Sequence, residues 1–332
     1  MHEKGRQAEH ARNRQLEALL ADLARDLEQG SGAPPAPADQ PALPPVFLVG
    51  TARSGTTLAL QWLAAGGGFT YPTNLVSRFP SAPWVGERVA LLLTDPDFDH
   101  RGELTLDGSP NPEPWTSDLG KTRGLLAPHE FRYWWRRFLP DDPEAAPTAD
   151  IVRMGCELAA WEAVRGKPIL MKALTADWHI PWLADVFPQA LFIHMTRDPV
   201  CTMRSLLKVR REFYGNENEW YSFRPPEYKQ LRYLDPVAQV AGQVYHTDLA
   251  VRQGLAEVPR ARFFTLPYDD LCAAPAAVHK LMTIWLGGHG IDPWEWQGPD
   301  AFPDANDALH QDPRRDELHQ AWAEFNRTGY LV

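Results

Sequence analysis

The sequence predicts an α/β fold in which a parallel β-sheet of about four or five strands is flanked by helices. Two observations support this prediction. First, the apolar run Val46 to Val49 leads into Gly50 and is followed by an apolar pattern at helical spacing, which is typical of a buried strand that enters a helix. Second, short apolar runs alternate with helical patterns from residue 151 onward. Such alternation implies parallel strands with helices on both faces.

The composition is that of a globular protein with 332 residues, 44% of them hydrophobic and 23% charged. No apolar run approaches the ~20 residues of a membrane-spanning helix, and the polar N-terminus is unlike a signal peptide. Three widely spaced cysteines, Cys156, Cys201 and Cys272, indicate free thiols in a reducing cytoplasm and no metal site. The net charge of −10 argues against a nucleic-acid partner, which requires a broad basic surface.

The first 45 residues are predicted to form a helix and a linker. Within residues 1–32, leucines fall on one face of a helix at positions 16, 19, 20, 23 and 27. This helix could pack on its own domain or could join two subunits of a homo-oligomer. Residues 33–45 are proline-rich and are expected to form a semi-stiff linker to a domain at 46–332.

The domain that begins at residue 46 is expected to contain one large insertion and a series of alternating strands and helices. Residues 66–150 show no strand–helix rhythm and are predicted to be a large irregular and helical insertion, with one aromatic-rich helix at 125–139. Because parallel strands end at one edge, the loops after Val49, Met171 and Met195 should meet there and bind the ligand. The other expected helices are 151–165, 178–187, 199–211, 236–257, 275–287 and 313–326, and the other strands are 168–172, 190–195 and 262–266.

The loop after the first strand has the spacing of a phosphate-binding loop. Gly50-x4-Gly55-x-Thr57 matches a Walker A loop, but Thr56 stands at the lysine position and Arg53 supplies a cation inside the loop. Backbone N–H groups of such a loop and of the helix that follows point into one concavity that favours an anion. The fold is therefore expected to be P-loop-like, with a phosphate group at this loop.

A second candidate anion site follows the predicted strand 190–195. Arg197 leaves the strand, Pro199 opens a helix, and Ser205 lies about two turns into that helix. A guanidinium and a hydroxyl so placed can hold one phosphate, with Asp198 expected to cap the helix. Taken alone, the pattern favours a surface arginine and a helix-interior serine.

Together the two motifs resemble those of the sulfotransferase family, in its bacterial form. Enzymes of that family use 3′-phosphoadenosine-5′-phosphosulfate (PAPS). The resemblance spans roughly residues 46–65 and 168–290, and it includes the segment from Leu266 to Leu271 and Lys172 at a strand end. It implies that the 5′-phosphosulfate is held by Arg53, Ser54, Gly55, Thr56 and Thr57, and the 3′-phosphate by Arg197 and Ser205.

The resemblance also implies a reaction: in-line transfer of a sulfuryl group from PAPS to an acceptor hydroxyl, leaving adenosine 3′,5′-bisphosphate. Arg53 and Lys172 would stabilise the charge on the bridging oxygen as its bond to sulfur breaks. No metal is expected, because a sulfonate carries less charge than a terminal phosphate.

A general base is expected within hydrogen-bond reach of the acceptor hydroxyl. Glu130 is the favoured candidate and His129 is close behind, because the segment that begins at Pro128 opens an aromatic-rich helix. The alternative for Glu130 is a first-turn glutamate stabilised by the helix dipole. The alternative for His129 is a packed or exposed histidine.

The acceptor and two other functions stay open. The 13 tryptophans most simply fill the core, but those in irregular segments could also wall an acceptor pocket for an aromatic ring, a sugar face or an acyl chain. The acceptor is expected to be a small molecule or a carrier- or glycan-type hydroxyl. A P-loop kinase or NTPase would need a lysine at position 56, and a catalytically silent scaffold of the same fold is the third possibility.

Overall fold

A computed structural model describes residues 37–95, 121–147 and 150–329, with isolated positions at 21, 25, 27 and 117–118. The predicted N-terminal helix falls almost wholly outside these residues, so its part in an oligomer stays a prediction. Of its leucines the structure describes Leu27, which packs against the core. The division into a linker and one domain also stays a prediction.

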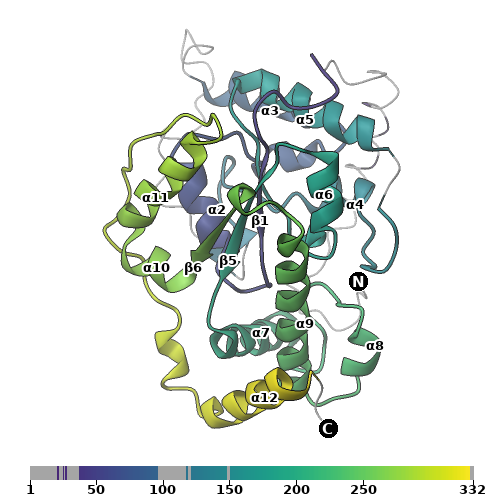
Figure 1. Cartoon of the computed structure of the whole chain (residues 1–332), viewed down its shortest axis with the longest axis vertical. Coiled ribbons are helices and arrows are strands. Elements are labelled where there is room, and N and C mark those ends of the chain that lie inside the picture. The colour runs from purple at the N-terminus through teal and green to yellow at the C-terminus, as the bar shows by residue number, and fades with distance from the viewer. Residues whose placement is uncertain are drawn as a thin grey trace.

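A four-stranded parallel sheet forms the centre of the described part of the chain (Figure 1). Its order is β4–β1–β5–β6, so β1 pairs with β4 on one side and β5 on the other. This arrangement confirms the predicted fold class. The strands are β1 (Val46–Val49), β4 (Leu170–Lys172), β5 (Leu191–Thr196) and β6 (Phe263–Pro267), with two-residue strands β2 (Ser117–Asp118) and β3 (Lys121–Thr122) apart from the sheet.

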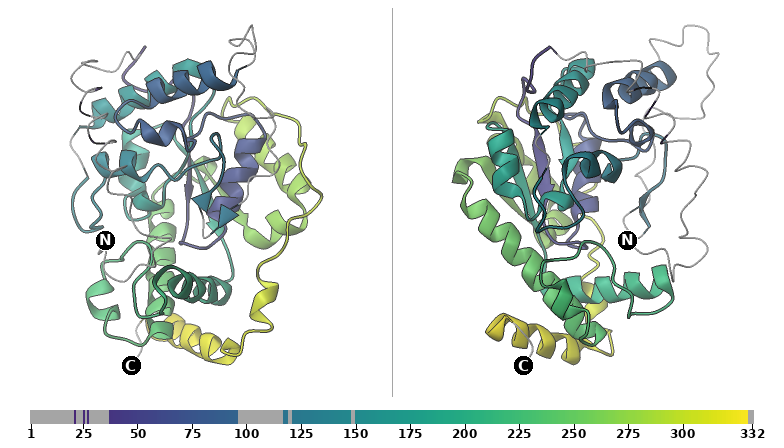
Figure 2. Two further views of the ribbon diagram at one scale, coloured as in Figure 1. Left: turned by 180° about the vertical axis from the view of Figure 1, so that it is seen from behind. Right: turned by 90° about the vertical axis from the view of Figure 1, so that its right-hand side faces the viewer.

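Helices cover both faces of the sheet (Figure 2). Phe47 and Val49 point into one apolar core, whereas Val46 and Leu48 point into the other. All four residues are fully buried, as a strand between two helical layers requires. The first core contains residues of α4 (Arg132–Phe138), α5 (Ile151–Arg165) and α6 (Ile180–Val186), and the second those of α2 (Thr56–Ala65), α10 (Tyr268–Ala273) and α11 (Pro275–Gly287).

A third apolar core lies beyond the carboxyl ends of the strands (Figure 1). It is enclosed by α7 (Pro199–Tyr214), α9 (Pro236–Ala256) and α12 (Arg315–Thr328). The short helix α8 (Tyr228–Leu231) packs on α9. This core holds α7 and its side chains against the sheet edge where the predicted ligand loops end.

The predicted insertion is where the structure departs most from the expected elements. It contains α3 (Pro83–Thr94), which packs on α5, and its predicted helix 125–139 is only the seven-residue α4. The helix cannot begin before residue 132, because Phe131 has a left-handed backbone with φ of 52°. The described residues contain no helix that is long and apolar enough to cross a membrane. All three cysteines are free thiols, as expected.

Candidate functional site

The loop from Gly50 to Gly55 is pressed against β5 and α10. Gly50 has φ of 137°, and a Cβ atom there would lie 2.5 Å from the carbonyl oxygen of Met195. Gly55 has φ of 102°, and a Cβ atom there would lie 2.5 Å from the ring of Tyr268. Both positions therefore require glycine, because a side chain at either one would prevent the loop backbone from packing this closely against β5 and α10.

The start of α2 has the features of an anion site. Its N-cap is Gly55, which offers no side chain to the first-turn N–H groups. Among the described residues, the buried hydroxyl of Ser54 has no hydrogen-bond partner. Uncapped N–H groups and an unpaired hydroxyl at the positive end of a helix suit a bound phosphate. These residues thus fit the phosphate end of a nucleotide.

Arg53 joins the first motif to the second. Its left-handed backbone, with φ of 72°, costs a non-glycine residue about 1–2 kcal/mol. Its Nε donates to Ser205 Oγ at 3.2 Å. Its carbonyl oxygen accepts from a terminal nitrogen of Arg197 at 2.9 Å. The two predicted anion sites are therefore parts of one continuous surface.

Arg197 is also held by two other segments of the chain. Its guanidinium lies 4.4 Å from the ring centre of Tyr268. Its Nε donates to Asn306 Oδ1 at 2.7 Å. The expected cap is confirmed, because Asp198 accepts from the N–H of Cys201 at 2.8 Å and so fixes the start of the helix that carries Ser205.

Lys172 lies at the end of β4 and reaches the start of α2. Its ammonium nitrogen is 3.3 Å from Thr57 Oγ1 and 3.2 Å from Glu130 Oε1. The Lys172 side chain is 9% exposed, whereas that of Glu130 is 42% exposed. The lysine is thus a mostly buried charge between the phosphate loop and a more accessible carboxylate.

A tight turn, rather than a helix dipole, positions Glu130. His129 Nδ1 accepts from the N–H of Phe131 at 2.9 Å, and the helix begins only after that turn. Trp135 then donates from its indole to the carbonyl oxygen of Lys172 at 3.0 Å. This bond docks α4 on the end of β4 and sets Glu130 beside the lysine. The first-turn interpretation of Glu130 is therefore wrong.

The two candidate bases differ in protonation. Burial lowers the pKa of His129 to about 4, so its ring is neutral at pH 7. Because Nδ1 accepts a hydrogen bond, the ring proton is on Nε2, which then has no lone pair for a second proton. Desolvation alone would raise the pKa of Glu130, but Lys172, with smaller contributions from Arg132 and His129, brings that pKa below its usual value. The carboxylate of Glu130 is thus ionised at pH 7.

Asp177 lies beside the phosphate loop, and no sequence pattern predicts it there. It is 1% exposed, and its Oδ1 accepts from the N–H of Gly50 at 3.1 Å. Burial raises the pKa of this carboxyl well above its usual value, although the Gly50 hydrogen bond and the Lys172 charge oppose the shift. Asp177 lies five residues past the end of β4, where local sequence patterns do not predict contacts.

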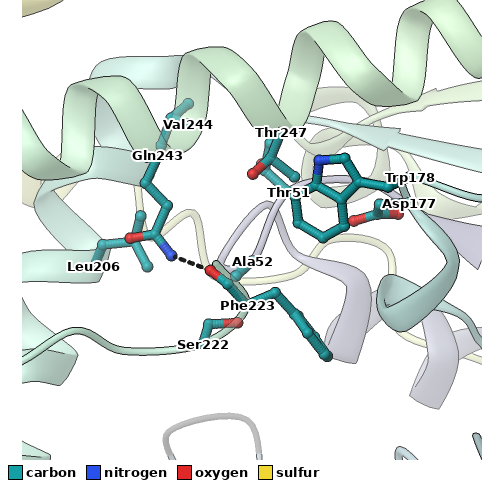
Figure 3. Close-up of a pocket in the computed structure, with 10 residues that line it drawn as sticks. All are labelled: Thr51, Ala52, Asp177, Trp178, Leu206, Ser222, Phe223, Gln243, Val244 and Thr247. Atoms are coloured by element: carbon teal, nitrogen blue, oxygen red, sulfur yellow. Dashed lines mark hydrogen bonds between the residues drawn. The ribbon is translucent and has the colours of Figure 1, made fainter. Parts of the chain in front are cut away.

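A small cavity lies beside the phosphate loop (Figure 3). Its volume of about 10 Å³ suits roughly one water molecule. Gln243 donates to the carbonyl oxygen of Phe223 at 3.2 Å across one side of it. Trp178 lines this cavity, whereas Trp134 and Trp135 are fully buried in the core. The cavity thus lies between the phosphate loop and the irregular segment 214–235, and it is too small to hold an acceptor.

The sequence matches a protein-family model described as "Sulfotransferase family" over residues 44–288. The chain belongs to the sulfotransferase family. This finding confirms the predicted resemblance. The matched range of the sulfotransferase model includes every residue predicted for the site and ends before Asn306.

Relatives and solved structures agree with this family. The chain is 26% identical over 260 residues to the omega-hydroxy-beta-dihydromenaquinone-9 sulfotransferase Stf3 of Mycobacterium bovis and of Mycobacterium tuberculosis. The alignment covers 74% of this chain and 63% of those proteins, so the chain spans less than two thirds of their length.

Two crystal structures of sulfotransferases share the fold. STF9 from Mycobacterium avium superposes with a TM-score of 0.56 at 17% identity, covering 98% of this chain and 87% of that one. STF1 from Mycobacterium tuberculosis H37Rv has a TM-score of 0.56 at 16% identity, covering 97% and 88%. Both similarities support the P-loop-like arrangement of strands and helices.

Proposed function

We propose that the protein is a PAPS-dependent sulfotransferase that acts on a hydroxyl group. The observation that carries this proposal is the continuous anion surface, in which Arg53 links the uncapped start of α2 to Ser205 and Arg197. PAPS carries a phosphosulfate at one end of its ribose and a phosphate at the other. Two joined anion sites on one sheet edge suit that shape.

Each end of the donor has candidate partners in this chain. The loop N–H groups and the hydroxyls of Ser54, Thr56 and Thr57 would hold the 5′-phosphosulfate, together with Arg53. Arg197 and Ser205 would hold the 3′-phosphate with a guanidinium fork and a hydroxyl. When bound, PAPS supplies an electrophilic sulfonate and a phosphate leaving group.

The chain's own residues would supply proton transfer and charge stabilisation. Glu130 would accept the proton of the acceptor hydroxyl, since its carboxylate is ionised and partly exposed. Lys172, between Thr57 and Glu130, would stabilise negative charge near the phosphate loop. His129 would position Glu130 through the turn that ends at Phe131.

For the acceptor we propose a hydroxyl on a largely apolar small molecule. The mycobacterial relatives act, by their names, on an omega-hydroxy-dihydromenaquinone, which is a compound of this kind. We also propose a cytoplasmic location, which the free thiols support. Threonine at position 56, where a P-loop kinase has its lysine, argues against a P-loop kinase.

A transfer assay with ³⁵S-labelled PAPS tests this function. Purified protein is incubated with phenols, sugars, long-chain alcohols and carrier-bound hydroxyls, and labelled products are separated and counted. We expect label on at least one acceptor with the wild type and little with Glu130→Gln. Phosphoryl transfer from ATP and magnesium, with no sulfate transfer to any acceptor, would favour the kinase instead.

A further inference from the structure

A second and larger cavity lies outside the site described above. Its volume is about 290 Å³, and it is lined by the end of α7, the loop at 215–227, α8 and the first turn of α9. Trp220 and Arg224 of this loop line it, whereas Ser222 and Phe223 line the small cavity beside the phosphate loop. The two cavities therefore use different residues of one loop.

The walls of this second cavity are rich in guanidinium groups. Arg224 lies 4.4 Å from the ring centre of Tyr228, and Arg232 lies 4.8 Å from that of Tyr233. Within the part of the chain that the structure describes, neither arginine forms an ion pair. Stacking on a ring leaves the N–H edge of a guanidinium available to an anion.

A third guanidinium lies directly behind the cavity wall. Arg210 is 0% exposed, stacks 5.0 Å from the ring of Trp220, and donates to Gln239 at 2.7 Å. Its other partners are the carbonyl oxygen of Glu217 and the amide oxygen of Gln243, and its Nε has no partner among the described residues. Its hydrogen bonds therefore go to neutral oxygens, and the Glu217 carboxylate acts on it through its charge alone.

Nearby carboxylates offset these three cations only in part. Glu217 is bonded to Arg211 and to Arg314, and Glu227 lies 3.3 Å from His246. Glu219 is exposed at the cavity rim and is the one carboxylate among the lining residues. The cavity is thus a locally positive region in a chain with a net charge of −10.

The remaining walls are flat and apolar. Trp220 and Tyr228 pack edge to face with ring centres 4.8 Å apart. Trp220 is mostly buried, so its position is fixed by the surrounding structure. Rings held in this way bind another flat group by stacking or edge contact.

We propose that this cavity binds a small molecule in which an anionic group, a carboxylate or a phosphate monoester, is attached to a flat ring. Arg224 and Arg232 bind the anion by charge-assisted hydrogen bonds, and Arg210 adds long-range attraction from behind. Trp220 and Tyr228 contact the ring. This site does not depend on the sulfotransferase function and uses none of the residues assigned to it.

Calorimetric titration with phenyl phosphate, and separately with benzoate, tests the proposal. Both titrations are made with excess adenosine 3′,5′-bisphosphate, so that a donor site cannot take up the probe. We expect at least one probe to bind the wild type. The double variant Arg224→Gln/Arg232→Gln should bind that probe at least roughly tenfold more weakly. Phenol, which lacks the charge, is expected to bind far more weakly.

The matched control is Arg252→Gln, an exposed arginine on α9 that pairs with Asp248. This variant should bind each probe as the wild type does, and all variants should keep the wild-type melting temperature. Equal affinity in the double variant and the control, equal binding of phenol, or no binding of either probe would overturn the proposal. The comparison of variants remains decisive even if the bisphosphate does not bind.

Discussion

Glu130 and His129 are adjacent in the sequence but differ in their capacity to accept a proton. The His129 ring uses its lone pair on the N–H of Phe131. Glu130 keeps an ionised carboxylate beside Lys172. The sequence could name both candidates, but only the fold separates them, because the choice depends on one backbone hydrogen bond and on burial.

The first prediction concerns these two side chains. Glu130→Gln keeps the shape of the side chain but removes the base, so kcat should fall by about 10²–10⁴-fold with donor affinity nearly unchanged. His129→Gln should lose much less activity if this residue acts through the turn, where its Nδ1 accepts from the N–H of Phe131. Steady-state kinetics with an acceptor found in the transfer assay measures both. Full turnover by Glu130→Gln together with inactive His129→Gln would reverse the assignment.

The second prediction concerns pH. With Glu130 as the base, kcat/KM should fall in acid only at pH values below the usual glutamate pKa of about 4.3, because Lys172 lowers the pKa of this carboxyl. Folded His129 has a pKa of about 4, while in the unfolded chain it is about 6.5. Protonation therefore favours the unfolded state as the pH falls from about 6.5 towards 4, and stability should decline there.

A pH–rate profile between pH 5 and 8, restricted to conditions where the protein stays folded, measures the kinetic part. Within this range kcat/KM should not fall as the pH is lowered, and no inflection should appear near pH 6.5, because the carboxylate of Glu130 stays ionised. An inflection there that His129→Gln removes would mean that the histidine is the base. Chemical unfolding at pH 7 and pH 5 measures the stability change, which should shrink in His129→Gln.

At the scale of elements, local signals set some boundaries and long-range contacts set others. The helix 151–165 could be predicted to the residue because Asp150 caps it with its side chain and Gly166 ends it in a left-handed conformation. The start of α4 could not be predicted. It depends on the left-handed backbone of Phe131 and on a hydrogen bond from Trp135 to the carbonyl oxygen of Lys172, 37 residues away. The same limit applies to Asp177, whose partner Gly50 is 127 residues away.

The third prediction concerns the contact between Asp177 and the end of β1. Asp177→Ala leaves the buried N–H of Gly50 without an acceptor, which should lower the free energy of unfolding by about 1–3 kcal/mol and weaken binding of adenosine 3′,5′-bisphosphate. Asp177→Asn keeps an acceptor oxygen for that N–H, so it should resemble the wild type. Urea unfolding and calorimetry measure these effects. If the asparagine variant loses as much as the alanine variant, the charge of Asp177 matters rather than its hydrogen bond.

Across the whole molecule, the site draws on segments from most of the chain. The rule that ligands bind at the carboxyl edge of parallel strands was enough to bring Arg53, Lys172 and Arg197 together from the sequence. It could not predict the contribution of the C-terminal segment, which crosses this edge before α12 (Figure 1). There Asn306 accepts from Arg197, and Asp312 pairs with Arg204 at 2.8 Å. Such contacts carry no local pattern in the sequence.

We propose that one continuous surface, joined by Arg53, holds both ends of a PAPS-like donor. Calorimetric titration with adenosine 3′,5′-bisphosphate in the absence of divalent metal tests it most directly, with Arg252→Ala as the control. We expect the wild type and the control to bind one equivalent, and Arg53→Ala and Arg197→Ala each to bind at least about tenfold more weakly. Unchanged affinity in both variants, or binding of ATP with magnesium but not of the bisphosphate, would contradict it.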